Sequence, residues 1–173
     1  SFPTRRSSDL NAGFSLGNCF PATAVPHGFN FWTPITNAGV TNWFYEYHRA
    51  NTDEQNRPAL QAFGVSHLPS PWMGDRHTFQ IMPTAAESRI RPGRRARALP
   101  FQHTNEIARP HYYSVRFDNG IRTEIAPTDH AAIFRFTFPG KEASLIFDNV
   151  NCHGRLRLDR TAGDRKSTRL NSS

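Results

Sequence analysis

The sequence predicts an all-β protein built as an antiparallel β-sandwich, and three observations lead to this. Thirteen prolines and eleven glycines are scattered through the 173 residues, so the chain is broken into short segments. The second half alternates apolar and polar residues with period two, as half-buried strands do. No stretch repeats its apolar residues at helical spacing over three turns. A chain of this length corresponds to one domain.

The first half is interpreted as strands joined by turn-rich segments. Up to residue 43, short apolar pieces alternate with Gly, Pro and Asn, as in loops that enter and leave strands. Residues 41–49, TNWFYEYHR, are rich in strand formers and predict a strand. Residues 51–62 are polar and interrupted by proline, which predicts a surface excursion. Residues 77–83, HTFQIMP, predict a short strand that ends at its proline.

The second half predicts a meander of four antiparallel strands with one apolar face. Residues 111–117 and 121–128 alternate apolar and polar side chains on either side of Asn119-Gly120, the strongest short-range signal of a hairpin. Residues 131–138, AAIFRFTF, repeat the alternation, and residues 143–150, ASLIFDNV, follow across a Pro-Gly turn.

The net charge of +7 and the pI near 10.2 suggest a nucleic-acid partner, but the distribution of the charge argues against one. The two ten-residue ends carry five basic residues against two acidic ones. The arginine-rich run at residues 88–100 contains no aromatic residue, which favours a solvated loop over a phosphate-binding patch. No apolar window is long enough for a transmembrane helix, and no signal peptide opens the chain. We therefore expect neither nucleic acid nor a membrane as a partner.

Two groups of polar residues are candidates for chemistry. His67, Trp72 and Asp75 lie in a Pro/Gly-punctuated stretch, where an exposed Trp beside an Asp would suit a sugar. The alternative is that Trp72 fills the edge of the core and Asp75 caps a turn.

His103, Glu106 and His111 form the second group, on a segment that reads as irregular and contains a proline. Their spacing does not place three ligands on one face, which argues against zinc, and Glu106 could equally pair with Arg109. Cys19 and Cys152 lack metal-binding spacing, and leave open one disulfide or two free thiols. These residues alone do not predict an enzyme.

Three stretches, in order, resemble one family. They are GNCFPATAVPHGF (17–29), FGVSHLPSPWMGDRHTFQIMP (63–83) and the long run from FQHTNEIARPHYY to FRFTFP (101–139). They are similar to the opening and to two later stretches of the calcium-dependent α-mannosidases of glycoside hydrolase family 92. The resemblance covers roughly Gly17 to Asp148.

The resemblance implies a fragment of an N-terminal β-sandwich (supersandwich) domain that packs on a larger C-terminal helical domain in a two-domain enzyme. Members of this family are inverting exo-mannosidases that act on α-linked mannose in N-glycans and mannans. The catalytic acid, the base and the calcium ligands belong to the C-terminal domain, so this chain would hold no catalytic residue and no metal, and would be inactive alone. The implied partners are mannose-containing glycans and the missing helical domain, and the implied location is secreted or periplasmic. The alternative is a non-catalytic carbohydrate-binding β-sandwich module.

The resemblance also suggests which residues face the substrate. Candidates for the cleft wall are Phe20, Trp43, His67, Trp72 and Asp75. His27 stands where the family pattern has an apolar residue, and the stretch around Trp72 departs from the family's small-residue pattern.

The two ends of the chain are expected to have a different origin. SFPTRRSSDL and DRKSTRLNSS back-translate, with permitted codons throughout, to two common short-read sequencing adapters. We therefore expect residues 1–10 and 164–173 to be adapter-derived artefacts, and residues 11–163 to be the N-terminal β-sandwich domain fragment.

Overall fold

The computed structural model describes residues 20–39, 45, 58–66, 76–85, 92–149, 154–158 and 165–169. These residues contain strands and no helix, which confirms the predicted all-β class. The strands are β1 (Phe31–Ile35), β2 (Ala59–Leu60), β3 (Ala62–Ser66), β4 (Arg76–Thr84), β5 (Leu99–Arg109), β6 (Tyr112–Phe117), β7 (Arg122–Pro127), β8 (Ala132–Thr137), β9 (Ser144–Asp148), β10 (Gly154–Leu158) and β11 (Arg165–Arg169).

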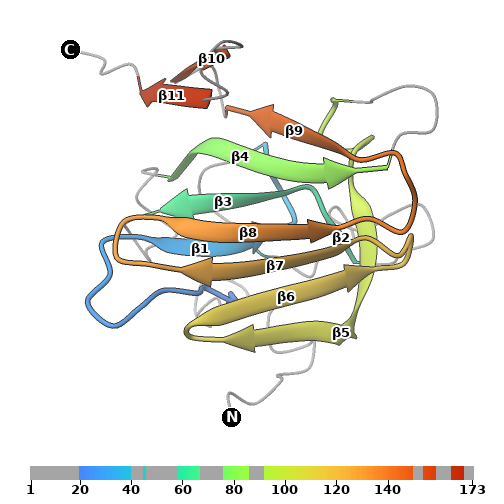
Figure 1. Ribbon diagram of the computed structural model, residues 1–173, viewed down its shortest axis with the longest axis horizontal. Coiled ribbons are helices and arrows are strands. Elements are labelled where there is room, and N and C mark those ends of the chain that lie inside the picture. Colours follow the sequence, from blue (N-terminus) through green and yellow to red (C-terminus); the bar gives the residue numbers. More distant parts are fainter. Residues whose placement is uncertain are drawn as a thin grey trace, which may run out of the picture.

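The strands form two main antiparallel sheets, shown in Figure 1. One has the order β1-β3-β4-β9 and the other has the order β2-β5-β6-β7-β8, while β10 and β11 pair separately. The two main sheets share one apolar core. Phe63 of β3 lies at its centre, with ring centroids 6.3 Å from Tyr113, 6.4 Å from Phe117 and 6.3 Å from Phe134 of the other sheet. The predicted β-sandwich is therefore observed.

The predicted hairpin at Asn119-Gly120 is confirmed. Gly120 has φ of 87°, a left-handed conformation that glycine adopts without steric cost. Its amide donates to the Phe117 carbonyl at 2.9 Å, and the Phe117 amide donates to Ile121 at 2.8 Å. This is a three-residue hairpin loop, which joins β6 to β7.

The predicted four-stranded meander is wrong in its last strand. β6, β7 and β8 are consecutive neighbours, but β9 leaves this sheet and pairs with β4, where Ile81 lies opposite Phe147. The local alternation specifies a strand at 144–148 without specifying its partner. The Pro-Gly turn leads across to the second layer, and this crossing closes the sandwich.

Three other local predictions are also corrected. Residues 58–62 are not a surface excursion, because β2 begins within them and Leu60 is fully buried. β4 continues through Pro83, which lies beyond the last β3 pair at Ile81 and therefore has a partner only in β9. The segment read as irregular is β5, whose register shifts between Phe101 and Glu106 and so hides its period of two. The strand predicted at residues 41–49 lies outside the described residues, except for Tyr45.

The solvated loop predicted for the arginine-rich run is wrong for Arg97, which is buried. Its residue is only 3% exposed, and its guanidinium donates to the Gln61 carbonyl at 2.8 Å and to Gln80 Oε1 at 3.1 Å. It also lies 2.9 Å from Asp148 Oδ2. Burial lowers the pKa of Arg97, and Asp148 opposes that shift. This arginine is a cross-link in the fold.

Candidate functional site

One end of the sandwich gathers the turns that flank the candidate functional stretches, at the left of Figure 1. Phe31, the first residue of β1, pairs with Ser66 at the end of β3, and Ser66 pairs with Arg76 at the start of β4. The β5–β6 and β7–β8 turns reach the same end. We call residues 20–30, 110–111 and 128–131 the loop end.

The first segment of the loop end is held firmly by backbone contacts. Thr23 and Trp32 exchange two backbone hydrogen bonds, at 2.8 and 2.9 Å. The Thr23 hydroxyl donates to the Pro110 carbonyl at 2.8 Å, and the Ala24 amide donates to the same oxygen at 2.6 Å. Phe20 is partly buried, with its ring centroid 5.4 Å from that of Phe31. Phe20 is therefore at the loop end, where it also packs on the core.

Phe29 and His130 form an aromatic surface across two distant segments. Their rings stack with centroids 5.4 Å apart and an interplanar angle of 16°, and Phe29 is 61% exposed. The Phe29 amide donates to the Asp129 carbonyl at 2.7 Å, and Asn30 Nδ2 donates to the His130 carbonyl at 3.1 Å. An exposed aromatic ring fixed in this way is a surface on which the apolar C–H groups of a sugar ring can pack.

The turn before Phe29 is strained at His27. Its φ of 61° is uncommon for a residue with a side chain. Gly28 follows with its amide 2.9 Å from the Val25 carbonyl, and a Cβ at Gly28 would lie only 3.0 Å from that oxygen. This close approach favours glycine at position 28, because a larger residue would have to push the Val25 backbone aside. His27, whose φ is positive, is also one of the residues at which this sequence departs from the family pattern.

Two buried polar atoms near the loop end have no hydrogen-bond partner among the residues that the structure describes. They are Asn30 Oδ1, an acceptor, and Trp32 Nε1, a donor. Leaving such a group unsatisfied costs about 1–3 kcal/mol. The Trp32 ring itself is fixed by an edge-on contact with Phe134, at 5.3 Å between centroids. The hydrogen bonding of the loop end is thus incomplete within the described part of the chain.

A second polar cluster surrounds Glu106. Its carboxylate accepts from the Tyr45 hydroxyl at 2.9 and 3.1 Å and from the Tyr113 hydroxyl at 2.5 Å. His103 Nδ1 lies 2.9 Å from Glu106 Oε2, whereas His111 is exposed in the β5–β6 turn. Burial, followed by the Glu106 charge, raises the pKa of Tyr113 well above its usual range. Glu106 pairs with these donors and not with Arg109, so it acts as a fixed acceptor.

Of the predicted substrate-facing residues, the structure describes Phe20. The other four, Trp43, His67, Trp72 and Asp75, lie outside the described residues, as do Cys19 and Cys152. The sequence interpretation missed the pairing of Phe29 with His130. Phe29 closes the first family-like stretch and could have been noticed, but nothing local marks His130. In the described ranges no three His, Cys, Asp or Glu side chains gather as a metal site, and no helix there could cross a bilayer.

Comparison with known proteins identifies the family. Residues 5–168 match the model of the glycosyl hydrolase family 92 N-terminal domain. A solved structure, a family GH92 inverting mannosidase of Bacteroides thetaiotaomicron, is 32% identical with a TM-score of 0.75. That alignment covers 96% of this chain and 23% of the mannosidase.

Two further relatives agree with this assignment. A family GH92 α-mannosidase of the same bacterium, solved with mannoimidazole, is 25% identical with a TM-score of 0.59, over 76% of this chain and 17% of its own. An uncharacterized secreted glycosidase of Arthroderma benhamiae is 24% identical over 73% of this chain and 16% of its own length. The chain therefore spans less than a quarter of each of these relatives.

Proposed function

The chain belongs to the glycosyl hydrolase family 92 N-terminal domain family, and from this premise we propose that it is part of an inverting exo-α-mannosidase. The substrate is α-linked mannose in N-glycans or mannans, and the chain supplies one part of the substrate cleft. The observation that carries this proposal is the likeness to an inverting mannosidase over 96% of the chain.

The catalytic acid and base are proposed to lie in the C-terminal helical domain. Inversion needs two carboxyl groups about 6.5–9.5 Å apart, one to protonate the leaving oxygen and one to activate water. Three carboxylates of this chain are engaged in its own structure: Glu106 by tyrosine hydroxyls, Glu124 by Arg135, and Asp148 by Arg97. These three carboxylates are held in structural contacts, and we propose that the catalytic pair lies in the other domain and that this chain alone is inactive.

The loop end is the proposed contribution to the cleft. Phe20 and the Phe29–His130 stack lie there, beside the strand ends that flank residues 67–75. We propose that these rings and the side chains of Trp43, His67, Trp72 and Asp75 contact mannose. An exo-acting site needs a closed pocket around one terminal sugar, and a single sandwich end supplies only one wall of it.

The remaining parts of the proposal concern calcium, location and the chain ends. Calcium, whose ligands are oxygen atoms, is proposed to bind in the C-terminal domain, as the resemblance to family 92 implies. Its chemistry there would be to bind oxygen atoms of the substrate. The protein is proposed to be secreted or periplasmic, and residues 1–10 and 164–173 to be adapter-derived.

Binding and hydrolysis by the chain alone test this assignment. We expect no hydrolysis of an aryl α-mannoside and no saturable binding of methyl α-mannoside below about 10 mM, because a half-cleft makes too few contacts. The Phe29→Ala variant should then behave like the parent chain. Saturable binding in the micromolar range that Phe29→Ala abolishes would instead identify a self-sufficient carbohydrate-binding module and contradict the proposal.

A further inference from the structure

Two arginines occupy opposite positions on neighbouring strands, on the solvent side of the five-stranded sheet. Arg116 of β6 is the direct cross-strand partner of Arg122 of β7, and both are exposed. Like charges directly opposite one another destabilise a sheet. Arg122 Nη2 lies 3.2 Å from Glu124 Oε1, which offsets part of its charge. Arg116 has no side-chain partner within the described ranges.

The only carboxylate on this face of β6, β7 and β8 is already committed. Glu124 accepts from Arg135 at 2.6 and 2.8 Å and from the Tyr112 hydroxyl at 2.6 Å. Hydrogen bonds from Arg135 and Tyr112 lower its pKa to about 2, so it is ionised at neutral pH. This face therefore carries three arginines, Arg116, Arg122 and Arg135, against the single negative charge of Glu124. Because Arg135 makes the shortest of the arginine contacts with Glu124, the excess positive charge lies at Arg116 and Arg122.

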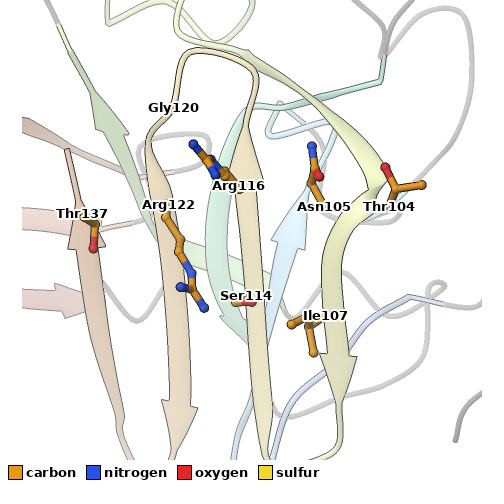
Figure 2. A pocket seen from close by; sticks show the side chains of 8 residues that line it. All are labelled: Thr104, Asn105, Ile107, Ser114, Arg116, Gly120, Arg122 and Thr137. Carbon is orange, nitrogen blue, oxygen red and sulfur yellow. The ribbon is translucent and has the colours of Figure 1, made fainter. Parts of the chain in front are cut away.

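A hollow of about 380 Å³ opens beside this pair (Figure 2). Its lining consists of Thr104, Asn105, Ile107, Ser114, Arg116, Gly120, Arg122 and Thr137. The register shift in β5 makes one wall, because residues 102–105 oppose the single residue Arg116 between the pairs Phe101–Phe117 and Glu106–Val115. Bulges of this kind re-aim side chains, and here they bring Thr104 and Asn105 to the hollow.

The polar side chains that line the hollow are available to a ligand. Thr104, Asn105, Ser114 and Thr137 make no side-chain hydrogen bond within the described part of the chain. Ser114 is only 3% exposed, yet it borders the hollow. Hydroxyl and amide donors around a guanidinium are the groups that bind tetrahedral oxyanions, since the planar fork of arginine matches two oxygens at once.

We infer that this hollow binds an oxyanion, a phosphate or sulfate group, either free or carried on a sugar. Arg116 is its principal ligand, Arg122 is the second, and the four polar side chains complete the shell. The volume falls within the range of small-molecule sites and exceeds the need of a bare ion. The site lies toward the β6–β7 turn, at the other end of these strands from the loop end, and is thus separate from the proposed mannose cleft.

Titration of the full chain with sodium phosphate, followed in ¹H–¹⁵N spectra against sodium chloride at equal ionic strength, tests the site. We expect saturable shifts at the amides of Ser114, Arg116 and Arg122. Arg116→Gln should weaken phosphate binding by about tenfold or more, as for loss of a charge-assisted pair. Arg95→Gln removes the same charge from an exposed loop position and should change the affinity less than about twofold.

Titrations with other ligands distinguish a free oxyanion from one carried on a sugar, and two results would overturn the inference. Tighter binding of glucose 6-phosphate than of phosphate, with no binding of glucose, would assign the hollow to a phosphorylated sugar. Equal binding of both, or of sulfate, would assign it to the free ion. Shifts that rise linearly without saturation, or equal losses in Arg116→Gln and Arg95→Gln, would show only diffuse charge and overturn the inference. No mannoside or hydrolysis enters this test, so its outcome is independent of the proposed function.

Discussion

Arg97 lies 2.9 Å from the Asp148 carboxylate, and this contact joins the loop before β5 to the end of β9. The guanidinium side chain is 1% exposed, whereas the carboxylate is 28% exposed. Arg97 also donates to the carbonyl of Gln61, between β2 and β3, and to Gln80 Oε1 of β4. The pair therefore holds β9 in the sheet that local sequence did not predict for it.

Removing the carboxylate should destabilise the fold strongly. Asp148→Asn leaves the Arg97 charge buried without its counter-ion, and we expect the free energy of unfolding to fall by about 3 kcal/mol. Urea denaturation measures the change. Arg94→Gln is the matched control, because Arg94 lies 3.5 Å from the same carboxylate but is 34% exposed. It should cost less than about 1 kcal/mol, and equal losses in both variants would contradict the buried role of Arg97.

Acid should weaken the fold through Glu124. Its pKa is about 2 in the folded chain against the ordinary 4.5, so its stabilising contribution is present above pH 4.5 and is lost as the pH falls toward 2. Unfolding free energies measured across that window should decline, and Glu124→Gln should flatten the decline. Glu142→Gln, at an exposed position with no such contacts among the described residues, should retain the parent profile. An unchanged profile in Glu124→Gln would contradict this assignment.

Alkali should act through Tyr113. Because burial raises its pKa in the folded chain, its contribution is complete below pH 10 and is lost as the pH rises above that value, where the unfolded chain ionises. Tyr113→Phe also removes the donor to Glu106 and should cost about 1–2 kcal/mol at neutral pH. Absorbance of tyrosinate during alkaline titration should lose its unfolding-linked component in this variant. Retention of that component would assign it to another tyrosine.

Trimming the ends tests their proposed origin. A polypeptide of residues 11–163 should unfold with the same free energy as the full chain, within about 0.5 kcal/mol, because adapter-derived residues were not selected to stabilise a fold. Chemical denaturation of the two purified chains compares them. β11 lies in the removed segment and pairs with β10. A loss above about 1 kcal/mol would therefore make this strand part of the fold.

Local chemistry accounts for what the sequence predicted well. Asn119-Gly120 favours a tight loop through its own backbone preferences, whatever the rest of the fold. The period-two pattern beside it predicts strands with one buried face. The pairing of β9 with β4 depends on the contact between Arg97 and Asp148, which are 51 residues apart in the printed sequence. No local stretch of sequence contains both residues, so local patterns could not predict this pairing. The same limit hid the Phe29–His130 stack. The β5 bulge erased the alternation on which strand prediction depends, and with it the wall of the hollow that Thr104 and Asn105 form.

The most direct test of the proposed function is to sequence the source DNA outward through the codons for Asn11 and Gly163, express the complete reading frame, and assay it with an aryl α-mannoside in the presence of calcium. We predict that the frame continues into a helical domain, that the terminal decamers disappear, and that the product is released first as β-mannose, as inversion requires. A frame that ends in DRKSTRLNSS, or a complete protein that leaves the α-mannoside intact, would contradict the proposal.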